Sequence, residues 1–542
     1  MPLYAMSVFL LPRVTCQRIE RLLNSFWWES KGINSSGIHW MSWQRLSAPK
    51  KFGGLGFKQI REFNVAMIGK QGWRLLTKPE ALVTKVFKAM YFPKTSFLEA
   101  QLGSNPSYCW RSILEAKNLI SNGVRKRIGD GSNTLVWGDP WLADRVNPFI
   151  LTPRPPFMPN LPVCFLLNHD AGGWNLEVVQ SLFCPRDVDQ ISRVPLQLDS
   201  EDKWYWAGET HGEYSVKEAY RRLVGEATST PDFSRWGQIW QIPIAPKIRI
   251  CLWRTIRNIL PVKVALITKG VEIEIECPVC GGAAETIDHI FLQCPLAIGV
   301  WNLLGWSRHL VQTESLVEWM EYQFSKLSIK ELKLVAEVIW AIWRARNKAV
   351  WDHYIPSPQS VVSWIIEVLL EPPNKTGQSG RQESMQVSPR SEHRVFRCYV
   401  DAAIFPSSKE VAFGSVIFDP GGSFYAAINR MMQCPLEPVI AEAMACREAL
   451  TWARANEIQD MELLTDCRWV AEALCERNIQ VFSYLGTIIK DCKALLAQFN
   501  SALVAHIPRE DNGIAHTLAR SAITQSSTWN TSPPDCISHL LE

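Results

Sequence analysis

The chain has 542 residues, of which 47% are hydrophobic and 20% charged, and its formal net charge is +4. This length predicts three or four domains, and the composition excludes a disordered chain. Fifteen scattered cysteines and an apolar start without a basic n-region or a cleavage site favour free thiols in a reducing compartment. No stretch reaches 18 uninterrupted apolar residues, so we expect an intracellular, soluble protein that no membrane holds.

The first 150 residues are expected to be mostly helical and basic. The spacing of apolar residues predicts helices over residues 14–28 and 63–76. Between them, the glycine-rich segment 49–57 lacks the P-loop pattern and is expected to be a structural turn. Residues 1–100 hold 15 Lys/Arg against 5 Asp/Glu. This surplus indicates either a face that binds nucleic-acid phosphates or an ordinary solvated surface.

The middle of the chain alternates irregular and helical segments. Residues 151–200 are rich in proline and are expected to form a connector. Residues 201–305 read as a helical block with a cysteine–histidine cluster. Helical spacing over 328–353 and 361–370 predicts a helical connector at 306–370. Residues 371–393 lose almost all large apolar side chains, which is typical of a flexible linker.

The cysteine–histidine cluster has the spacing of a zinc site. Cys277, Cys280, His289 and Cys294 form the pattern C-x2-C-x8-H-x4-C. These are the ligand types and the number of a tetrahedral structural site, with no open position for catalysis. A lone C-x-x-C pair could instead be redox-active. Four ligands at this spacing favour Zn²⁺ in a structural role.

Residues 394–525 show a different pattern, strands followed by alternating helices and strands. It predicts an α/β domain with a mixed five-stranded sheet, followed by a tail at 526–542. The fold class is therefore multidomain, mostly α in the N-terminal and zinc-binding regions and α/β at the C-terminal end. The expected strands cover 395–401, 411–418, 423–430, 461–465 and 502–507, and the expected helices 438–455, 468–476, 484–499 and 512–522.

Three carboxylates stand where this topology gathers functional groups. Asp401 is expected to close the first strand and Asp466 the fourth, and Glu442 lies on the first helix beside its apolar stripe. A strand-terminal Asp is by itself usually a turn residue. Three converging carboxylates repel one another unless a cation holds them, and Mg²⁺ prefers carboxylate oxygen. The trio therefore predicts a magnesium site.

The same residues carry a family resemblance. Tyr399-Val-Asp-Ala-Ala403, Glu442, Leu464-Thr-Asp466, Pro508-Arg-Glu-x-Asn512 and Ala515-His-x-Leu-Ala519 resemble the ribonuclease H domain of plant non-LTR retroelements. The resemblance implies a two-metal hydrolysis of the RNA strand of RNA–DNA hybrids. It also implies Asp401, Glu442 and Asp466 as ligands of Mg²⁺ or Mn²⁺, and Arg509 and Asn512 as residues that bind nucleic acid.

One position departs from that pattern. The family often has a fourth carboxylate where this chain has His516. An imidazole suits zinc or manganese better than magnesium, so a catalytic His516 predicts weaker activity or a preference for Mn²⁺. Alternatively, His516 faces solvent on the last helix.

Two further regions resemble the same elements. Tyr214-Ser-Val-Lys-Glu-Ala-Tyr220, Trp240, Trp253-Arg254 and Glu285-Thr-x-x-His289 resemble the zinc-binding domain of LINE-type reverse transcriptases. Residues 1–150, with Phe26-Trp-Trp28 and Ile128-Gly-Asp-Gly131 among their motifs, resemble the region after the polymerase palm. No tyrosine-x-aspartate-aspartate tetrad is present, so polymerisation is not expected. The basic helix with Lys247, Arg249, Arg254 and Arg257 indicates either a nucleic-acid contact or a solvated face.

Three functions compete on these observations. The first is an active ribonuclease H-type endonuclease that acts on hybrids, which the survival of all three carboxylates favours. The second is a nucleic-acid-binding remnant whose nuclease has decayed. The third is a zinc-scaffolded adaptor for an unrelated partner. Nucleic acid is the expected partner, protein partners are not indicated, and residence in the nucleus would follow from a hybrid substrate.

Overall fold

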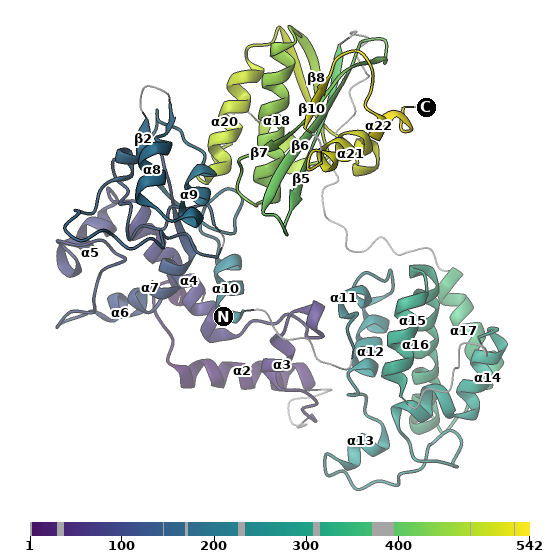
Figure 1. Cartoon of the computed structure of the whole chain (residues 1–542). Helices are drawn as coiled ribbons and strands as arrows, with labels where there is room; N and C mark the ends of the chain where they lie inside the picture. The colour runs from purple at the N-terminus through teal and green to yellow at the C-terminus, as the bar shows by residue number, and fades with distance from the viewer. Residues whose placement is uncertain are drawn as a thin grey trace. The chain divides into compact units, whose positions relative to one another are not determined.

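The computed structural model describes residues 3–29, 37–144, 146–168, 172–225, 233–306, 315–370, 395–476, 479–524 and 526–541. The chain forms two compact units, each assembled from segments that are far apart in the sequence (Figure 1). The predicted linker at 371–393 lies outside the described residues. Unit 1 consists of Met1–Phe9, Ala66–Arg222 and Gln386–Glu542, and unit 2 of Leu10–Val65 and Leu223–Met385.

The C-terminal part of unit 1 is built on a six-stranded mixed sheet with the order β10-β7-β6-β5-β8-β9. Neighbours from β10 to β5 are antiparallel, whereas β5, β8 and β9 run parallel. The five predicted strands are confirmed, and the prediction of five was one too few. The strands are β5 (Phe396–Phe405), β6 (Glu410–Phe418), β7 (Phe424–Met432), β8 (Asp460–Thr465), β9 (Ser501–His506) and β10 (Ser527–Trp529).

The sixth strand comes from the segment predicted as a tail. β10 has three residues and pairs with the outer edge of β7. The side chain of Asn429 fixes it by accepting a hydrogen bond from the backbone N–H of Ser527 at 2.9 Å. So short a strand carries no alternating pattern, and its pairing depends on a distant side chain. This is why periodicity did not indicate it.

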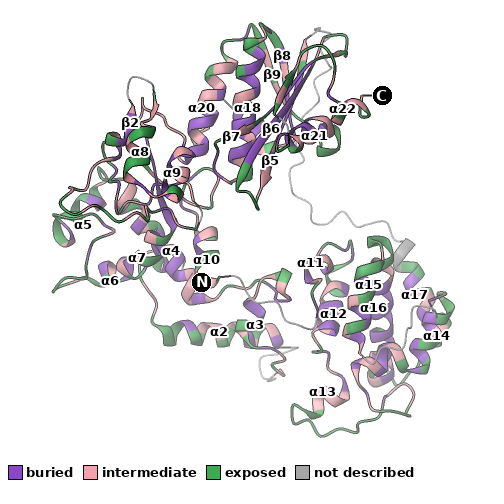
Figure 2. Cartoon of the chain, viewed as in Figure 1, coloured by how far each residue is buried: buried purple, intermediate pink, exposed green. Residues whose placement is uncertain are grey.

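Helices cover both faces of the sheet (Figures 1 and 2). Helices α18 and α20 bury one face in a large core, and α21 packs on the other face around Val416 and Leu518. Gly414 allows this close approach, because a Cβ there would lie 2.3 Å from the backbone nitrogen of Ala519. The helical elements are α18 (Pro438–Ala455), α19 (Arg468–Cys475), α20 (Tyr484–Leu496), η5 (Arg509–Asn512), α21 (Gly513–Ser521) and α22 (Asp535–Ser538).

The rest of unit 1 packs on this domain, and the prediction of an irregular connector at 151–200 is wrong. Val163, Val179 and Ile191 are buried in the same core as α18 and α20. Proline starts a helix here instead of breaking one, since Pro185 occupies the first turn of α9. The elements are α1 (Leu3–Met6), α5 (Leu82–Tyr91), α6 (Tyr108–Glu115), α7 (Lys117–Gly123), β1 (Val124–Arg127), η2 (Val163–Leu166), β2 (Leu167–Asn168), β3 (Gly173–Trp174), α8 (Leu176–Leu182), α9 (Pro185–Ser192) and β4 (Lys203–Trp206).

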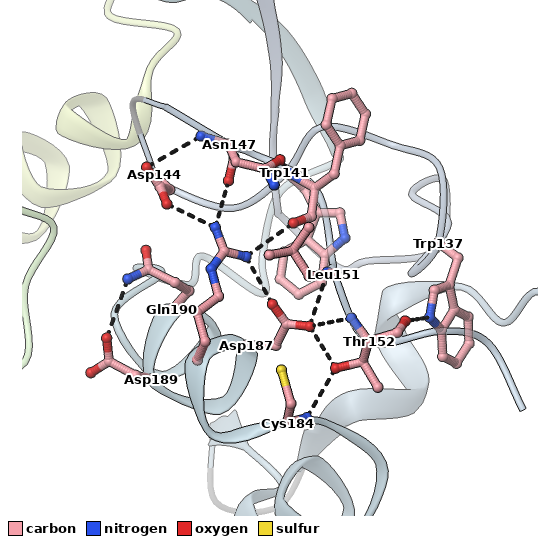
Figure 3. Close-up of polar contacts among 12 residues, drawn as sticks. Trp137, Trp141, Asp144, Asn147, Leu151, Thr152, Cys184, Asp187, Asp189 and Gln190 are labelled. Atoms are coloured by element: carbon pink, nitrogen blue, oxygen red, sulfur yellow. Dashed lines mark hydrogen bonds and ion pairs between the residues drawn. The ribbon is translucent and has the colours of Figure 1, made fainter.

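A buried carboxylate fastens this region internally (Figure 3). Asp187 is fully buried on α9, and its Oδ2 accepts hydrogen bonds from the backbone N–H groups of Leu151 and Thr152 and from the Thr152 hydroxyl. Arg186 donates to its other oxygen at 2.8 Å. Burial by itself would raise the pKa of Asp187, but the bonds from Thr152 and Arg186 outweigh it and hold that pKa below its usual value.

Unit 2 is helical and has one continuous core. The helices predicted as a connector at 306–370 share this core with the cysteine–histidine segment, so they belong to one folded body. Its elements are α2 (Arg13–Trp28), α3 (Trp43–Ser47), η1 (Lys50–Phe52), α11 (Trp236–Ile239), α12 (Pro246–Ile256), α13 (Lys263–Ile267), η3 (His289–Gln293), α14 (Pro295–Leu303), α15 (Leu316–Lys326), α16 (Ile329–Trp351) and α17 (Pro358–Leu370). Two helices, α4 (Ile60–Thr77) and α10 (Val216–Val224), contain the limits between the units.

The glycine-rich segment is a structural turn, as predicted. The backbone carbonyl of Gly53 accepts hydrogen bonds from the indole of Trp253 and the guanidinium of Arg257, at 2.9 and 2.8 Å. Gly53 has φ +78°, and a Cβ would collide with Arg257. Arg249 likewise donates to the carbonyls of Ile242 and Ile244. Arg249 and Arg257 are two of the four basic residues that the sequence placed on one helix, which is α12 and the residue after it. Both stabilise the fold, a role that neither the nucleic-acid alternative nor the solvated-face alternative had included.

None of the helices among the described residues combines the length and the apolar character that crossing a bilayer requires.

Candidate metal centres

Strand register brings the first two carboxylates together. β5 and β8 are parallel, and the last pair in their register is Val400 with Thr465. Asp401 and Asp466 each follow that pair directly, so they leave the sheet side by side. The expectation that Asp401 closes its strand is wrong, because β5 continues to Phe405 through its antiparallel pairing with β6. It is β8 that ends at this level.

Glu442 completes the cluster from the first turns of α18. One oxygen from each of Asp401, Glu442 and Asp466 can be chosen so that all lie within 4.8 Å of one another. Burial raises the pKa of Glu442 well above its usual value, and the negative charges of Asp401 and Asp466 raise it further. Its Oε2 is buried and accepts no hydrogen bond from the described residues. A buried carboxylate oxygen without a partner beside two other carboxylates is the arrangement that a divalent cation relieves.

His516 is partly exposed, and its ring contacts the carboxylate cluster. Its Nδ1 lies 2.7 Å from Oδ2 of Asp401, and about a third of its side chain is exposed. Burial raises the pKa of Asp401, while the hydrogen bond from His516 opposes that rise. The imidazole therefore borders the carboxylate cluster, at the place where the sequence suggested a fourth member.

The two residues predicted to bind nucleic acid lie in different surroundings. Arg509 is exposed, whereas Asn512 is 1% exposed and donates from Nδ2 to the backbone carbonyl of Val400 at 3.0 Å. That contact holds the residue next to Asp401 and gives Asn512 a role within the fold, and its predicted contact with nucleic acid stays a prediction. A polar residue between a turn and a helix carries no signal that separates these two roles.

The cysteine–histidine cluster assembles in unit 2 as its spacing predicted. Ligand atoms of Cys277, Cys280, His289 and Cys294 all lie within 4.8 Å of one another, and Sγ of Cys280 is 3.3 Å from Nε2 of His289. Gly281, at φ +67°, turns the chain after the first pair. The neighbouring thiol of Cys294 lowers the pKa of Cys277, which favours a thiolate in the cluster. Four soft ligands at this separation fit a tetrahedral Zn²⁺.

A buried ion pair supports the cluster from outside. Glu285, between the two ligand pairs, is fully buried and binds the guanidinium of Arg346 on α16 with both oxygens, at 2.5 and 2.8 Å. The backbone N–H of Lys263 donates to the same carboxylate at 2.6 Å. The ligand segment is thus tied to the long central helix of its own unit. Sequence reasoning listed Glu285 only as part of a motif and did not identify its partner.

In comparisons with known proteins, the segments that hold the two clusters match two different family models. Residues 214–301 match the family model described as zinc-binding in reverse transcriptase, and residues 400–522 match the model described as reverse transcriptase-like. An uncharacterized mitochondrial protein of Arabidopsis thaliana is 40% identical over 157 residues, which is 29% of this chain and 97% of that protein. The chain belongs to a family of plant retroelement-derived proteins.

Two further proteins resemble the chain, one over its whole length and one over about a quarter of it. A putative ribonuclease H protein of Arabidopsis thaliana is 24% identical over 576 residues, covering 100% of this chain and 90% of that protein. Among solved structures, a ribonuclease H1 from Halobacterium salinarum is 25% identical, with a TM-score of 0.22, and covers 24% of this chain and 97% of that one. The C-terminal part of the chain is a ribonuclease H-like domain.

Proposed function

We propose that the C-terminal domain hydrolyses the RNA strand of RNA–DNA hybrids with two divalent metal ions. The observation that carries the proposal is the convergence of Asp401, Glu442 and Asp466 around the partnerless oxygen of Glu442. Like charges close together in a partly buried site destabilise a fold. The presence of all three carboxylates therefore supports a site that binds cations.

The residues of this site divide the work. Asp401, Glu442 and Asp466 would hold the ions, which when bound supply an activated water and stabilise charge on the leaving oxygen. Their fit rests on the donor set, which is three hard oxygen ligands suited to Mg²⁺ or Mn²⁺. His516 would orient the Asp401 carboxylate through the 2.7 Å contact, and Asn512 fixes the strand beside it. Discrimination against DNA would come from contacts to the 2′-hydroxyl.

The test is cleavage of a labelled RNA–DNA hybrid by the full chain in Mg²⁺ and in Mn²⁺. Asp401→Asn should reduce cleavage by about 10²-fold or more, since metal-ion catalysis contributes several kcal/mol and each ~1.4 kcal/mol is tenfold. Asp460→Asn, an exposed acid at the start of β8, is the matched control and should cleave normally. Absence of cleavage in both metals by a folded protein that still binds the hybrid would instead establish a decayed, nucleic-acid-binding remnant.

A second variant examines His516. If His516 stands where a fourth carboxylate would serve magnesium better, His516→Asp should raise the ratio of Mg²⁺- to Mn²⁺-supported cleavage. The ratio is measured on one preparation, so partial misfolding affects both terms equally. An unchanged ratio would show that His516 acts only through its contact with Asp401.

We also propose a structural Zn²⁺ at Cys277, Cys280, His289 and Cys294. The support is the four-ligand geometry and the match of this segment to the zinc-binding family model. Because all four positions are protein ligands, this ion would hold unit 2 together and would take no part in hydrolysis.

A further inference from the structure

The surface of α2 and the segment that follows it in unit 2 is strongly basic. Among the described residues of Leu10–Val65, Glu29 is the one exposed acidic side chain. Positive charge at this density attracts a polyanion and steers its approach. Arg13, Gln17 and Arg21 follow one another at four-residue steps and therefore form a single stripe along α2. The exposed basic side chains are Arg13, Arg18, Arg21, Arg45, Lys50, Lys51 and Lys58.

A cleft of about 420 Å³ lies at the beginning of this stripe, between α2, α3 and the start of α4. Arg13 and Gln17 line it from α2, and Trp43 and Gln44 line it from α3. The Trp43 ring is held in place, because it stacks on Phe57 at a centroid distance of 5.0 Å and an interplanar angle of 14°. The indole N–H of Trp43 donates to the backbone carbonyl of Lys58 at 3.0 Å, which fixes the ring further.

The polar groups of the cleft can read the edge of a nucleobase. The exposed side-chain amides of Gln17 and Gln44 make no hydrogen bond to other described residues, and each presents both a donor and an acceptor. Gln59 adds a third carboxamide to the lining. The acidic groups present are Glu62 and Glu20, and Glu20 already accepts a hydrogen bond from the backbone N–H of Ile60 at 2.8 Å.

We propose that this face of unit 2 binds single-stranded nucleic acid, with an unstacked base in the cleft and the backbone along the arginine stripe. A rigid aromatic wall with amide groups beside it is how proteins hold splayed-out bases, and arginines track the phosphates. A base within a duplex cannot enter the cleft without leaving its stack. The face belongs to unit 2 and the carboxylate cluster to unit 1, and the inference does not depend on the nuclease.

The experiment measures binding of fluorescent single-stranded RNA, single-stranded DNA and a duplex to the full chain carrying Asp401→Asn, in EDTA-free buffer without divalent ions. Arg13→Gln with Arg21→Gln should weaken single-strand binding several-fold and reduce the slope of log K against log salt by about 1.4, since each phosphate contact contributes about 0.7. Lys326→Gln with Lys330→Gln is the control, because it removes two exposed charges from α15 and α16.

A second pair of variants tests the cleft itself. Gln17→Ala with Gln44→Ala should weaken binding of single strands and leave duplex binding unchanged, while the exposed Gln359→Ala on α17 changes neither. Gln17 and Gln44 are exposed and make no hydrogen bond to other described residues, so the fold should survive. A stronger effect on RNA than on DNA would mean that the 2′-hydroxyl is also read, and equal effects would mean recognition of the base alone. Unchanged single-strand affinity in both pairs of variants, or duplex affinity that falls equally in the glutamine pair, would overturn the proposal.

Discussion

The cysteine–histidine cluster of unit 2 and the carboxylate cluster of unit 1 each bring their ligand atoms within 4.8 Å of one another. Their surroundings differ. The first is enclosed by a glycine turn, a wide helical turn and the buried Glu285–Arg346 pair. The second leaves Glu442 with a buried oxygen that no described residue binds, and half-exposed groups at its border.

The difference concerns the effect of each cluster on stability: an ion in the first would stabilise the fold, whereas the second destabilises it without an ion. Four protein ligands leave no position for a substrate, so an ion bound there would only contribute stability. Three carboxylates with an unsatisfied oxygen cost stability until an ion arrives, and they leave coordination positions for water and phosphate. The contrast predicts that replacing a ligand side chain lowers the stability of unit 2 at the cysteine–histidine cluster and raises the stability of unit 1 at the carboxylate cluster when no ion is present.

Removing zinc should have the largest effect. Structural zinc sites contribute about 10–16 kcal/mol of apparent binding free energy, which becomes folding free energy. A chelator, or Cys280→Ser, should therefore abolish hydrogen-exchange protection in the described residues of 233–370, which share one core, and leave residues 395–524 protected. Cys109→Ser, a half-buried thiol of unit 1 outside both clusters, serves as the control. One zinc per chain by elemental analysis is expected, and protection that survives chelation would contradict the structural role.

The second largest effect should come from the ion pair that supports the zinc cluster. Glu285→Gln leaves Arg346 buried without its counter-charge, and breaking such a pair costs about 3–5 kcal/mol. Replacing both partners by Met should cost less than the single change, because no charge is then stranded. Chemical denaturation of the zinc-loaded protein measures both. A double variant as unstable as the single one would show that the segment depends on the hydrogen bonds and not on the charges.

The elements of the molecule were more predictable from sequence than their association. Helical spacing placed α2, α4, α16 and α18 within a few residues, because the buried stripe of each helix is written in its own segment. The grouping of Leu10–Val65 with the zinc-binding segment has no such local signal. It depends on contacts such as that between Gly53 and Trp253, which are 200 residues apart.

The ligand residues were likewise easier to name than their positions. Residue types and order indicated both clusters, yet Asp401 lies inside β5 and meets Asp466 through the parallel register of β5 with β8. The contact between His516 and Asp401 joins residues 115 apart, and sequence alone left it as one of two alternatives. Packing decides which surfaces a side chain contacts. Packing between segments that are far apart in the sequence leaves no periodic pattern from which it could be predicted.

Asp187 provides a reference for a buried carboxylate whose partners are complete. Its hydrogen bonds hold its pKa below the usual value, so its contribution to stability is present above the unfolded-state pKa near 3.9 and is lost as pH falls through the lower, folded-state pKa. Asp187→Asn should cost about 1.5–3 kcal/mol at pH 7, the range of hydrogen bonds to charged groups. Unfolding midpoints at several pH values should show the gap narrowing toward pH 3. Glu472→Gln, whose pair with Arg468 on α19 of the same unit is exposed at both ends, should cost well under 1 kcal/mol.

Glu442 should respond in the opposite direction, by a smaller amount. Burial and the charges of Asp401 and Asp466 raise its pKa, so its contribution is fully present below the unfolded-state pKa and is lost as pH rises through the folded-state value. At neutral pH and without divalent ions, Glu442→Gln should therefore be more stable than the natural chain by about 1 kcal/mol or more, since each tenfold change in proton affinity is worth about 1.4 kcal/mol. Added Mg²⁺ or Mn²⁺ should raise the melting temperature of the natural chain and not that of the variant. A variant that is less stable without metal would mean that Glu442, like Asp187, already has its partners, and the carboxylate cluster would then be part of the fold and not a site for ions.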